Sequence, residues 1–234
     1  MLNITKNIKG KVIIAGFPGF GLVGTIATGY LAEHLKAEKI GTAWFEELPA
    51  TIAIHESKVV HPISFYHAKK YGIIIAHGIT GNSGVEWKIA GILRELAKKT
   101  GVKKIVTIEG VGSQNPEPEA RAYYYTSEEK EKKKIEKTGC QQLREGIIMG
   151  VTSALMIQPP EQITTIFTEA HAQIPDSKAA AKVIEILDKY MGLGVDYKPL
   201  IQEAEKFEQK LKSIMKQGVQ AQKKMDDEQE SYIG

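Results

Sequence analysis

The chain has 234 residues, of which 42% are hydrophobic and 25% are charged, and its formal net charge is +3. A chain of this size and composition can bury one sizeable core, as expected of a globular domain. The small charge, with no basic stripe interleaved with aromatic residues, gives no support for nucleic-acid binding.

Cysteine use and hydropathy restrict the class further. Cys140 is the single cysteine, which excludes a disulfide framework or a thiolate metal site within the chain and favours a reducing compartment. No apolar run reaches the ~18 residues that a membrane span needs, and residues 1–6 carry no signal-peptide core. We therefore expect a soluble, cytoplasmic protein with no membrane partner.

The first half of the chain alternates strands and helices. Residues 11–15 form an apolar, β-branched run typical of a buried strand, and a glycine-rich turn follows at 16–21. Apolar residues from Leu22 to Leu35 then recur at helical spacing. Further strands are predicted at 39–44, 51–54, 63–67 and 73–77.

The strand–glycine–helix pattern recurs after residue 77. Residues 78–84 form a second turn, and Ser83 with Glu86 makes a capping box for a helix that continues to Leu96. A strand is predicted at 103–108. Repeated units of this kind indicate an α/β fold, with a mostly parallel sheet and helices on both faces.

The second half contains three further helices and a strand. The charge run at 128–137 predicts a solvated helix, and the apolar run at 147–157 predicts a helix buried on all sides. Residues 163–167 are typical of a strand. Asp176 is expected to cap a helix that continues through Lys189.

Beyond Gly194 the pattern changes to that of a long amphipathic helix. Its apolar positions alternate spacings of four and three over about three and a half heptads. These positions, which form a heptad seam, are Leu200, Ala204, Phe207, Leu211, Ile214, Gly218, Ala221 and Met225. The first half of this seam either packs back on the body or meets another copy. We therefore divide the chain into an α/β domain at 1–194, a C-terminal amphipathic helix at 195–225 and a flexible tail at 226–234.

The seam also predicts self-association. Phe207, Leu211 and Ile214 are exposed unless they meet the body or another copy, and Phe17 and Phe20 can add to a subunit contact. We expect a closed homo-oligomer larger than a dimer.

The turn after the first strand has two interpretations. Residues 19–24 match the dinucleotide fingerprint letter for letter, with Glu46 and Glu47 about twenty residues on. Against this, three residues separate the first strand from the fingerprint, Pro18 removes one amide from the loop, and two phenylalanines stand where a pyrophosphate would approach bare backbone. The other interpretation is a tight turn whose glycines allow close helix–strand packing.

No other pattern predicts catalysis. His77 and Ser83 suggest an acid–base pair, but His77 has no identifiable orienting partner and is interpreted as structural. The remaining histidines show no metal-ligand spacing, and neither a nucleophile elbow nor a P-loop occurs. The sequence therefore predicts no catalytic, cofactor-binding or metal-binding residue.

The residues together resemble the PAC2 family of proteasome assembly chaperones, in its archaeal branch. The resemblance covers residues 1 to about 216 and rests on four segments, at 16–31, 78–90, 169–181 and 191–196. It implies a three-layer α/β/α sandwich, similar to nucleoside-phosphorylase-like folds, and no known catalytic activity. It also implies binding to proteasome α subunits, during ring assembly or at the finished α-ring.

The tail extends this resemblance. Some relatives carry a C-terminal hydrophobic–tyrosine–any-residue motif that docks between α subunits, whereas here Tyr232 is third from the end, before Ile233 and Gly234, and Ser231 is not hydrophobic. The tail is therefore expected to anchor the protein on the α subunits or on a partner chaperone. The alternative function is a nucleotide-binding or nucleoside-processing enzyme that uses the glycine-rich loops.

Overall fold

The computed structural model describes residues 1–6, 8–48, 50–55, 57–80, 84–112, 120–171 and 174–202. Its strands are β1 Leu2–Ile4, β2 Val12–Gly16, β3 Glu38–Ala43, β4 Ala53–His55, β5 Lys58–Val60, β6 Ile63–Ala68, β7 Ile73–Gly78, β8 Lys104–Gly112, β9 Ala122–Thr126, β10 Gln141–Gln142 and β11 Gln162–Ala170. Its helices are the short η1 Phe20–Leu22, α1 Val23–His34, α2 Glu86–Thr100, α3 Glu129–Glu136, α4 Gly150–Ile157 and α5 Ser177–Met191.

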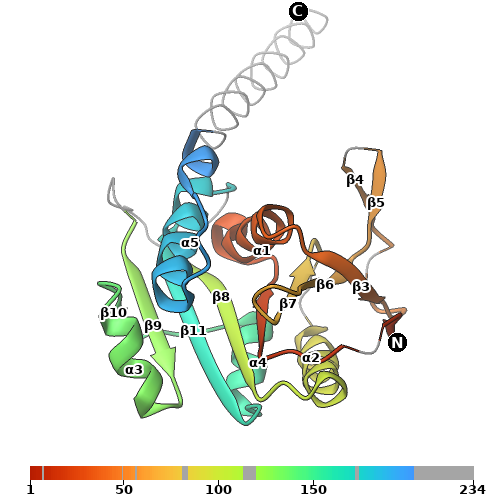
Figure 1. Ribbon diagram of the computed structural model, residues 1–234, viewed down its shortest axis with the longest axis horizontal. Helices are drawn as coiled ribbons and strands as arrows, with labels where there is room; N and C mark the ends of the chain where they lie inside the picture. The colour runs from red at the N-terminus through yellow and green to blue at the C-terminus, as the bar shows by residue number, and fades with distance from the viewer. Residues whose placement is uncertain are drawn as a thin grey trace, which may run out of the picture.

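A sheet of nine strands organises this part of the chain (Figure 1). The strand order is β1-β3-β6-β7-β2-β8-β11-β9-β10. The four central strands, β7, β2, β8 and β11, are parallel, and antiparallel pairs flank them on both sides. Strands β4 and β5 form a separate antiparallel hairpin.

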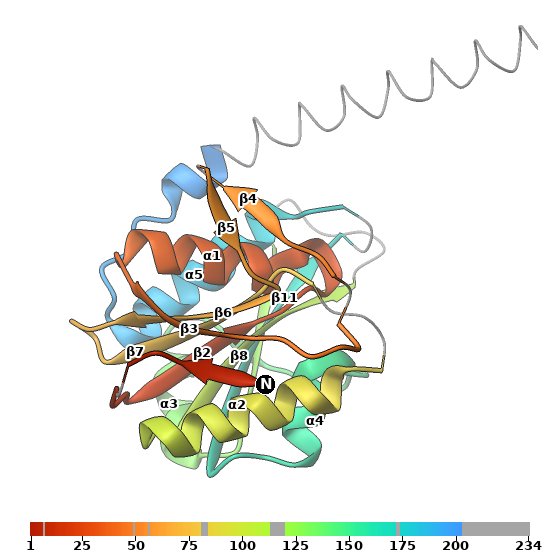
Figure 2. The same cartoon turned by 90° about the vertical axis from the view of Figure 1, so that its right-hand side faces the viewer.

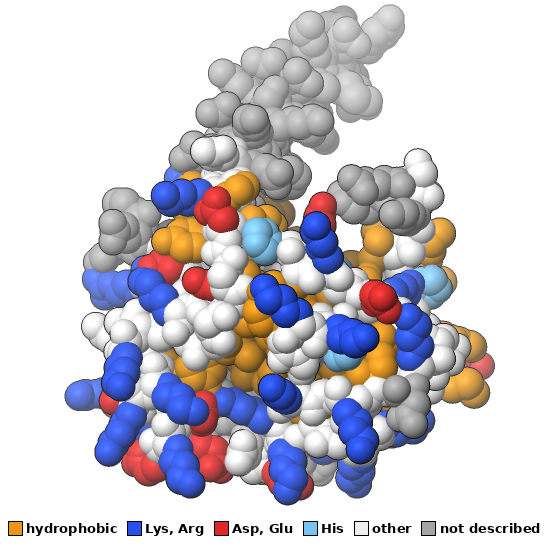
Figure 3. Space-filling model, in the orientation of Figure 1, with side chains coloured by type: hydrophobic (Ala, Val, Ile, Leu, Met, Phe, Trp, Pro, Cys, Tyr) orange, Lys and Arg blue, Asp and Glu red, His pale blue; other side chains and the backbone are white. Residues whose placement is uncertain are grey.

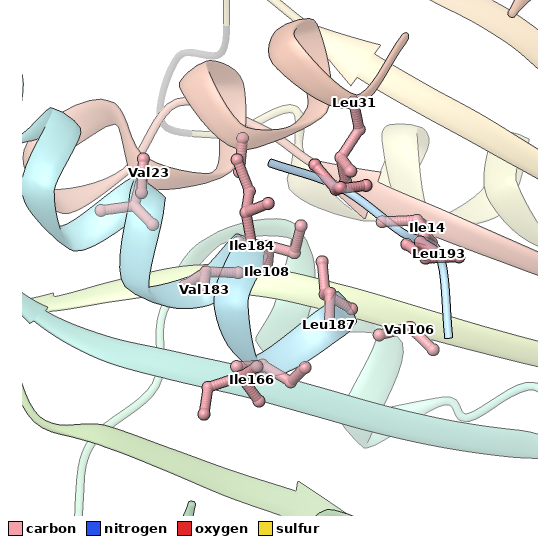
Figure 4. Close-up of a cluster of buried hydrophobic side chains, with 14 of the residues drawn as sticks. Ile14, Val23, Leu31, Val106, Ile108, Ile166, Val183, Ile184, Leu187 and Leu193 are labelled. Carbon is pink, nitrogen blue, oxygen red and sulfur yellow. The ribbon is translucent and has the colours of Figure 1, made fainter. Parts of the chain in front are cut away.

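Helices cover both faces of the sheet, which confirms the predicted α/β/α sandwich (Figure 2). On β2, Ile14 packs in the cluster that includes α1 and α5, whereas Ile13 packs in the cluster that includes α2 and α4. Figure 4 shows side chains of the first cluster, among them Leu31 of α1, Leu187 of α5 and Ile14 of β2. Because the central strands are buried on both faces, they are continuous apolar runs in the sequence.

Packing continues past the predicted boundary at Gly194. Val195 and Leu200 are buried in the cluster with α1 and α5, and the Tyr30 hydroxyl donates to the carbonyl of Asp196 at 2.5 Å. Residues 198–202 are helical. The first position of the predicted seam thus packs on the body, whereas the seam beyond residue 202 and the tail lie outside the described residues. The three-part division stays a prediction.

The predicted helix at 147–157 is wrong over its first three residues. Helix α4 begins at Gly150. The φ of +80° at this residue prevents the helix from continuing back into residues 147–149. Ile147 is 91% exposed and Met149 is 61% exposed. An apolar run alone does not distinguish a buried helix from an exposed loop.

Two other differences are smaller. Helix α2 begins at Glu86 with Val85 as its N-cap, and Glu86 accepts a hydrogen bond from the Gly84 amide at 2.8 Å. Its predicted capping partner, Ser83, lies outside the described residues. Strand β9 had no sequence prediction.

Across the described ranges, none of the helices has the length and apolar character of a membrane-crossing segment.

Candidate functional site

The first glycine-rich turn lies at the carboxyl edge of the sheet, beside the ends of β7 and β8. Because β2, β7 and β8 are parallel, their carboxyl ends lie together. Gly16 ends β2 and pairs with His77 on β7 and with Ile108 on β8. The turn that follows Gly16 therefore lies beside Gly78 and beside residues 109–112 at the end of β8.

The glycines of the first turn serve close backbone packing. A Cβ at Gly16 would lie 2.1 Å from the carbonyl oxygen of Gly24, and a Cβ at Gly24 would lie 2.8 Å from that of Ile108. A Cβ at Gly110 would lie 2.1 Å from the carbonyl oxygen of Phe20. A side chain at any of these positions would push η1 and α1 off the sheet. This geometry favours the tight-turn interpretation of the fingerprint.

Gly21 holds the turn against the start of α5. Its φ of +62° is in the left-handed region, and its carbonyl accepts a hydrogen bond from the Asp176 amide at 2.8 Å. The Asp176 carboxylate accepts from the Ala179 amide at 2.9 Å, which confirms its predicted capping role. The same carboxylate accepts from the His171 amide at 3.1 Å, and His171 Nδ1 lies 2.7 Å from it. The sequence did not predict this link between Asp176 and the turn.

Glu109 lies beneath the exposed turn. Thr152, in the first turn of α4, donates to Glu109 Oε2 at 3.0 Å, and Glu109 Oε1 would lie 2.1 Å from a Cβ at Gly19. Burial raises the pKa of Glu109 to about 8, against the weaker opposing effect of the Thr152 hydrogen bond. The carboxyl group is therefore protonated near neutral pH.

The position of Glu109 bears on the dinucleotide interpretation. The space next to Gly19, where a pyrophosphate would approach bare backbone, holds a carboxyl group instead. In dinucleotide-binding proteins an acidic residue about twenty positions beyond the fingerprint binds the ribose. Glu47, one of the two acidic residues at that spacing here, instead lies 2.5 Å from Lys88 Nζ in an ion pair. The residues present do not fit a dinucleotide.

The two phenylalanines of the turn have different environments. Phe17 is 6% exposed and packs on β7, where a Cβ at Gly78 would lie 2.3 Å from its ring. Phe20 is half-buried, and its ring lies over Gly112. Of the two predicted contact residues, Phe20 presents more surface to a partner. The other predicted contact residues, Phe207, Leu211, Ile214, Tyr232, Ile233 and Gly234, lie outside the described residues, and the whole set stays a prediction.

A cavity of about 1550 Å³ opens beside this turn. Its walls are the turn, the end of β8, the start of α2 and the segment from Cys140 to Val151. On a further wall, the Tyr123 hydroxyl donates to Glu169 at 2.9 Å. The sequence missed the contribution of residues 143–149. The signal for it was an apolar triplet, Ile147 to Met149, between Gly146 and Gly150.

His77 is structural, in keeping with its interpretation from the sequence. Its Nδ1 lies 3.0 Å from the hydroxyl of Thr28, and that hydroxyl donates to the carbonyl of Gly24 at 2.7 Å. Burial lowers the pKa of His77 to about 4, so the ring is neutral. Its predicted partner Ser83 is not among the described residues. Within the described ranges, no three His, Cys, Asp or Glu side chains are placed to hold a metal ion.

Comparison with known proteins gives consistent matches. The sequence profile of the PAC2 family matches residues 13–215. An uncharacterised protein of Methanocaldococcus jannaschii is 24% identical over 228 residues, which are 96% of this chain and 94% of that protein.

Solved structures extend the likeness to the fold. Pyrococcus furiosus PbaA, described as an archaeal homologue of proteasome-assembly chaperone, is 30% identical, with a TM-score of 0.80 over 98% of each chain. Pyrococcus furiosus PbaB, described as an archaeal proteasome activator, is 23% identical, with a TM-score of 0.77 over 92% of this chain and 98% of its own.

Proposed function

Because the chain belongs to the PAC2 family, we propose that it is a non-catalytic, chaperone-like protein that binds proteasome α subunits or a partner chaperone. The observation that carries this proposal is the likeness to PbaA, at 30% identity over 98% of both chains. A match of that extent covers nearly the whole of both chains.

The turn supports a role without catalysis. Its glycines are occupied by contacts with the protein's own backbone, and Glu109 fills the space beneath Gly19. His77 is neutral, buried and bonded to Thr28. These groups hold the fold together at the position where α/β proteins often bind a ligand.

The tail is the proposed anchor. A tyrosine such as Tyr232 offers a large apolar area with few rotatable bonds to immobilise. A terminal carboxylate gains a charge-assisted hydrogen bond to a lysine in a pocket. Because three or four residues bind weakly alone, several tails presented by one oligomer would gain affinity through multivalency. Four of the five residues at 226–230 are acidic, and their charge favours solvation of the tail.

The hairpin β4–β5 offers a surface for that oligomer. Antiparallel neighbours such as β3 and β6 need only a short turn between them, yet here strands β4 and β5 stand between them in the chain and form a separate hairpin (Figure 1). Ile54 and Val59 pair across it, and both are exposed, as is Ile52 on the same face. Figure 3 shows apolar side chains at this edge of the molecule. A two-stranded hairpin is marginally stable alone, so we propose that a second copy covers this face.

Surface binding to purified α subunits tests the proposal. Tyr232→Ala is expected to weaken binding about tenfold or more, since an aromatic anchor contributes most of a short motif's affinity. A few residues added after Gly234 are expected to weaken it as well, because they move the carboxylate. Circular dichroism and light scattering should show an unchanged fold and oligomer in both variants. Equal affinities for all three proteins would assign any binding to the folded body.

Nucleotides provide the opposing test. If saturable binding of NAD or ATP were measured and Gly21→Ala removed it, the enzyme alternative would replace this proposal. We expect no thermal shift with either nucleotide.

A further inference from the structure

The cavity beside the turn is large enough for a polypeptide segment. Small-molecule sites usually measure about 300–1,000 Å³, whereas this cavity measures about 1550 Å³. Its apolar lining includes Phe20, Ile89, Ile148 and Val151. These side chains come from three separate parts of the chain, so the cavity is built by the tertiary fold.

One wall of the cavity is formed by strand β10 and the irregular segment that follows it. Strand β10 is the last strand of the sheet order, so one of its edges has no neighbouring strand among the described residues. The Leu143 amide extends its ladder by donating to the Tyr124 carbonyl at 2.9 Å. Residues 144–149 then continue as non-helical backbone, with the side chains of Ile147 and Met149 exposed. An extended peptide can add to an edge of this kind through main-chain hydrogen bonds.

The charges of the lining identify the chemistry of the occupant. The lining carries one cationic side chain, Arg144, and five carboxyl groups, those of Glu86, Glu109, Glu136, Glu145 and Glu169, of which Glu109 is protonated near neutral pH and adds no charge. Four of them accept hydrogen bonds from neutral donors, namely the Gly84 amide and the hydroxyls of Thr152, Tyr124 and Tyr123.

Three of the charged carboxyl groups have no cationic partner within the described part of the chain. There, no lysine or arginine forms an ion pair with the carboxyl groups of Glu86, Glu136 or Glu145. An anionic ligand such as a phosphate would be repelled from the lining, whereas a cationic ligand would gain contacts that the protein does not make by itself.

We propose that the cavity binds an extended segment of a partner protein in which lysine or arginine side chains alternate with apolar ones. The backbone of the segment lies along residues 141–149. Its apolar side chains enter the cavity beside Phe20 and Ile148, and its cationic side chains meet the carboxylates of Glu145 and Glu169. This site is separate from the proposed tail anchor and does not depend on it.

Fluorescence anisotropy with labelled peptides of about eight residues, the length of one strand, tests this site on the full-length protein. The probe alternates valine and lysine. One control peptide alternates valine and glutamate, and the other alternates serine and lysine. We expect saturable binding of the first peptide and at least about tenfold weaker binding of each control.

Two protein variants locate the binding. Glu145→Lys reverses an exposed charge on the cavity wall and is expected to weaken the valine–lysine peptide about tenfold or more. Glu161→Lys makes the same change at an exposed position that pairs with Lys103 at the start of β11 and does not line the cavity, and should leave the affinity unchanged. A third variant, Met149→Ser, removes apolar surface from the wall without changing its charge and is also expected to weaken binding.

Three results would overturn the proposal. They are a valine–lysine peptide that does not bind saturably, equal binding of the three peptides, and equal weakening by Glu145→Lys and Glu161→Lys, which would show attraction to overall charge alone. Binding to α subunits through the tail is measured separately with Tyr232→Ala, so failure of the cavity site leaves that result unaffected.

Discussion

The carboxyl group beneath the turn should make the stability of the protein depend on pH. Burial raises the pKa of Glu109 from 4.5 to about 8, so between these values the folded protein keeps a proton that the unfolded chain releases. The free energy of unfolding therefore falls as pH rises through this window and levels off above about pH 8. At about 1.4 kcal/mol per unit, the shift sets an upper limit of about 5 kcal/mol. Since the side chain is half-buried, water screens part of this effect, and we expect about 2–3 kcal/mol.

Glu109→Gln isolates this effect. Glutamine keeps the shape and can still accept the Thr152 hydrogen bond, but it has no proton to lose. Urea unfolding at about pH 5, 7 and 9 should show a variant close to the wild type at pH 5 and about 2–3 kcal/mol more stable at pH 9. Glu95→Gln, an exposed change on α2, serves as the control and should follow the wild type throughout. If the free energies of unfolding of Glu109→Gln and the wild type changed in parallel from pH 5 to 9, the raised pKa of Glu109 would be contradicted.

Three further predictions address the turn, the core and the hairpin. In urea unfolding, Gly21→Ala should destabilise the protein by about 1–3 kcal/mol more than Gly101→Ala. Both glycines have positive φ, but only Gly21 lacks room for a Cβ, so equal losses of stability would contradict the packing argument. Because the pKa of His77 is lowered to about 4, the free energy of unfolding should fall by up to about 3 kcal/mol as pH falls from 6.5 to 4. His77→Gln should remove most of that loss, and a variant that loses as much stability as the wild type over this pH range would refute the prediction. Ile54→Asp should lower the mass measured by light scattering, whereas Ile157→Asp, at another exposed isoleucine, should not; a monomeric wild type would end this account of the hairpin.

Most of the fold could be predicted because the central strands are buried on both faces. The runs at 11–15, 73–77 and 103–108 are short and rich in β-branched residues, which favours buried strands over helices. Strand β9 was missed because Ala122–Thr126 contains three tyrosines in a row, which follow no simple alternation. Its place depends on antiparallel pairing with β11, a contact that local sequence does not encode.

The site was less predictable, for related reasons. The glycines at 16–24 allowed both a ligand-binding loop and a packing turn, and only the positions of Ile108 and Phe20 favour the second. The carboxyl of Glu109 is held by Thr152, 43 residues away in sequence, from a helix whose start was itself predicted wrongly. Residues 147–149 were assigned to the core because they are apolar, although the tertiary fold leaves Ile147 and Met149 at the rim of the cavity.

Binding of the full-length protein to purified proteasome α subunits, both isolated and assembled into rings, tests the central claim most directly. The measurement compares the full-length chain with one that ends at Met225 on the same immobilised α subunits. We predict saturable binding of the full-length chain to at least one form, weakened about tenfold or more by the truncation. If the full-length chain bound neither form, direct engagement of the α subunits would be contradicted, and only the partner-chaperone form of the proposal would remain to be tested.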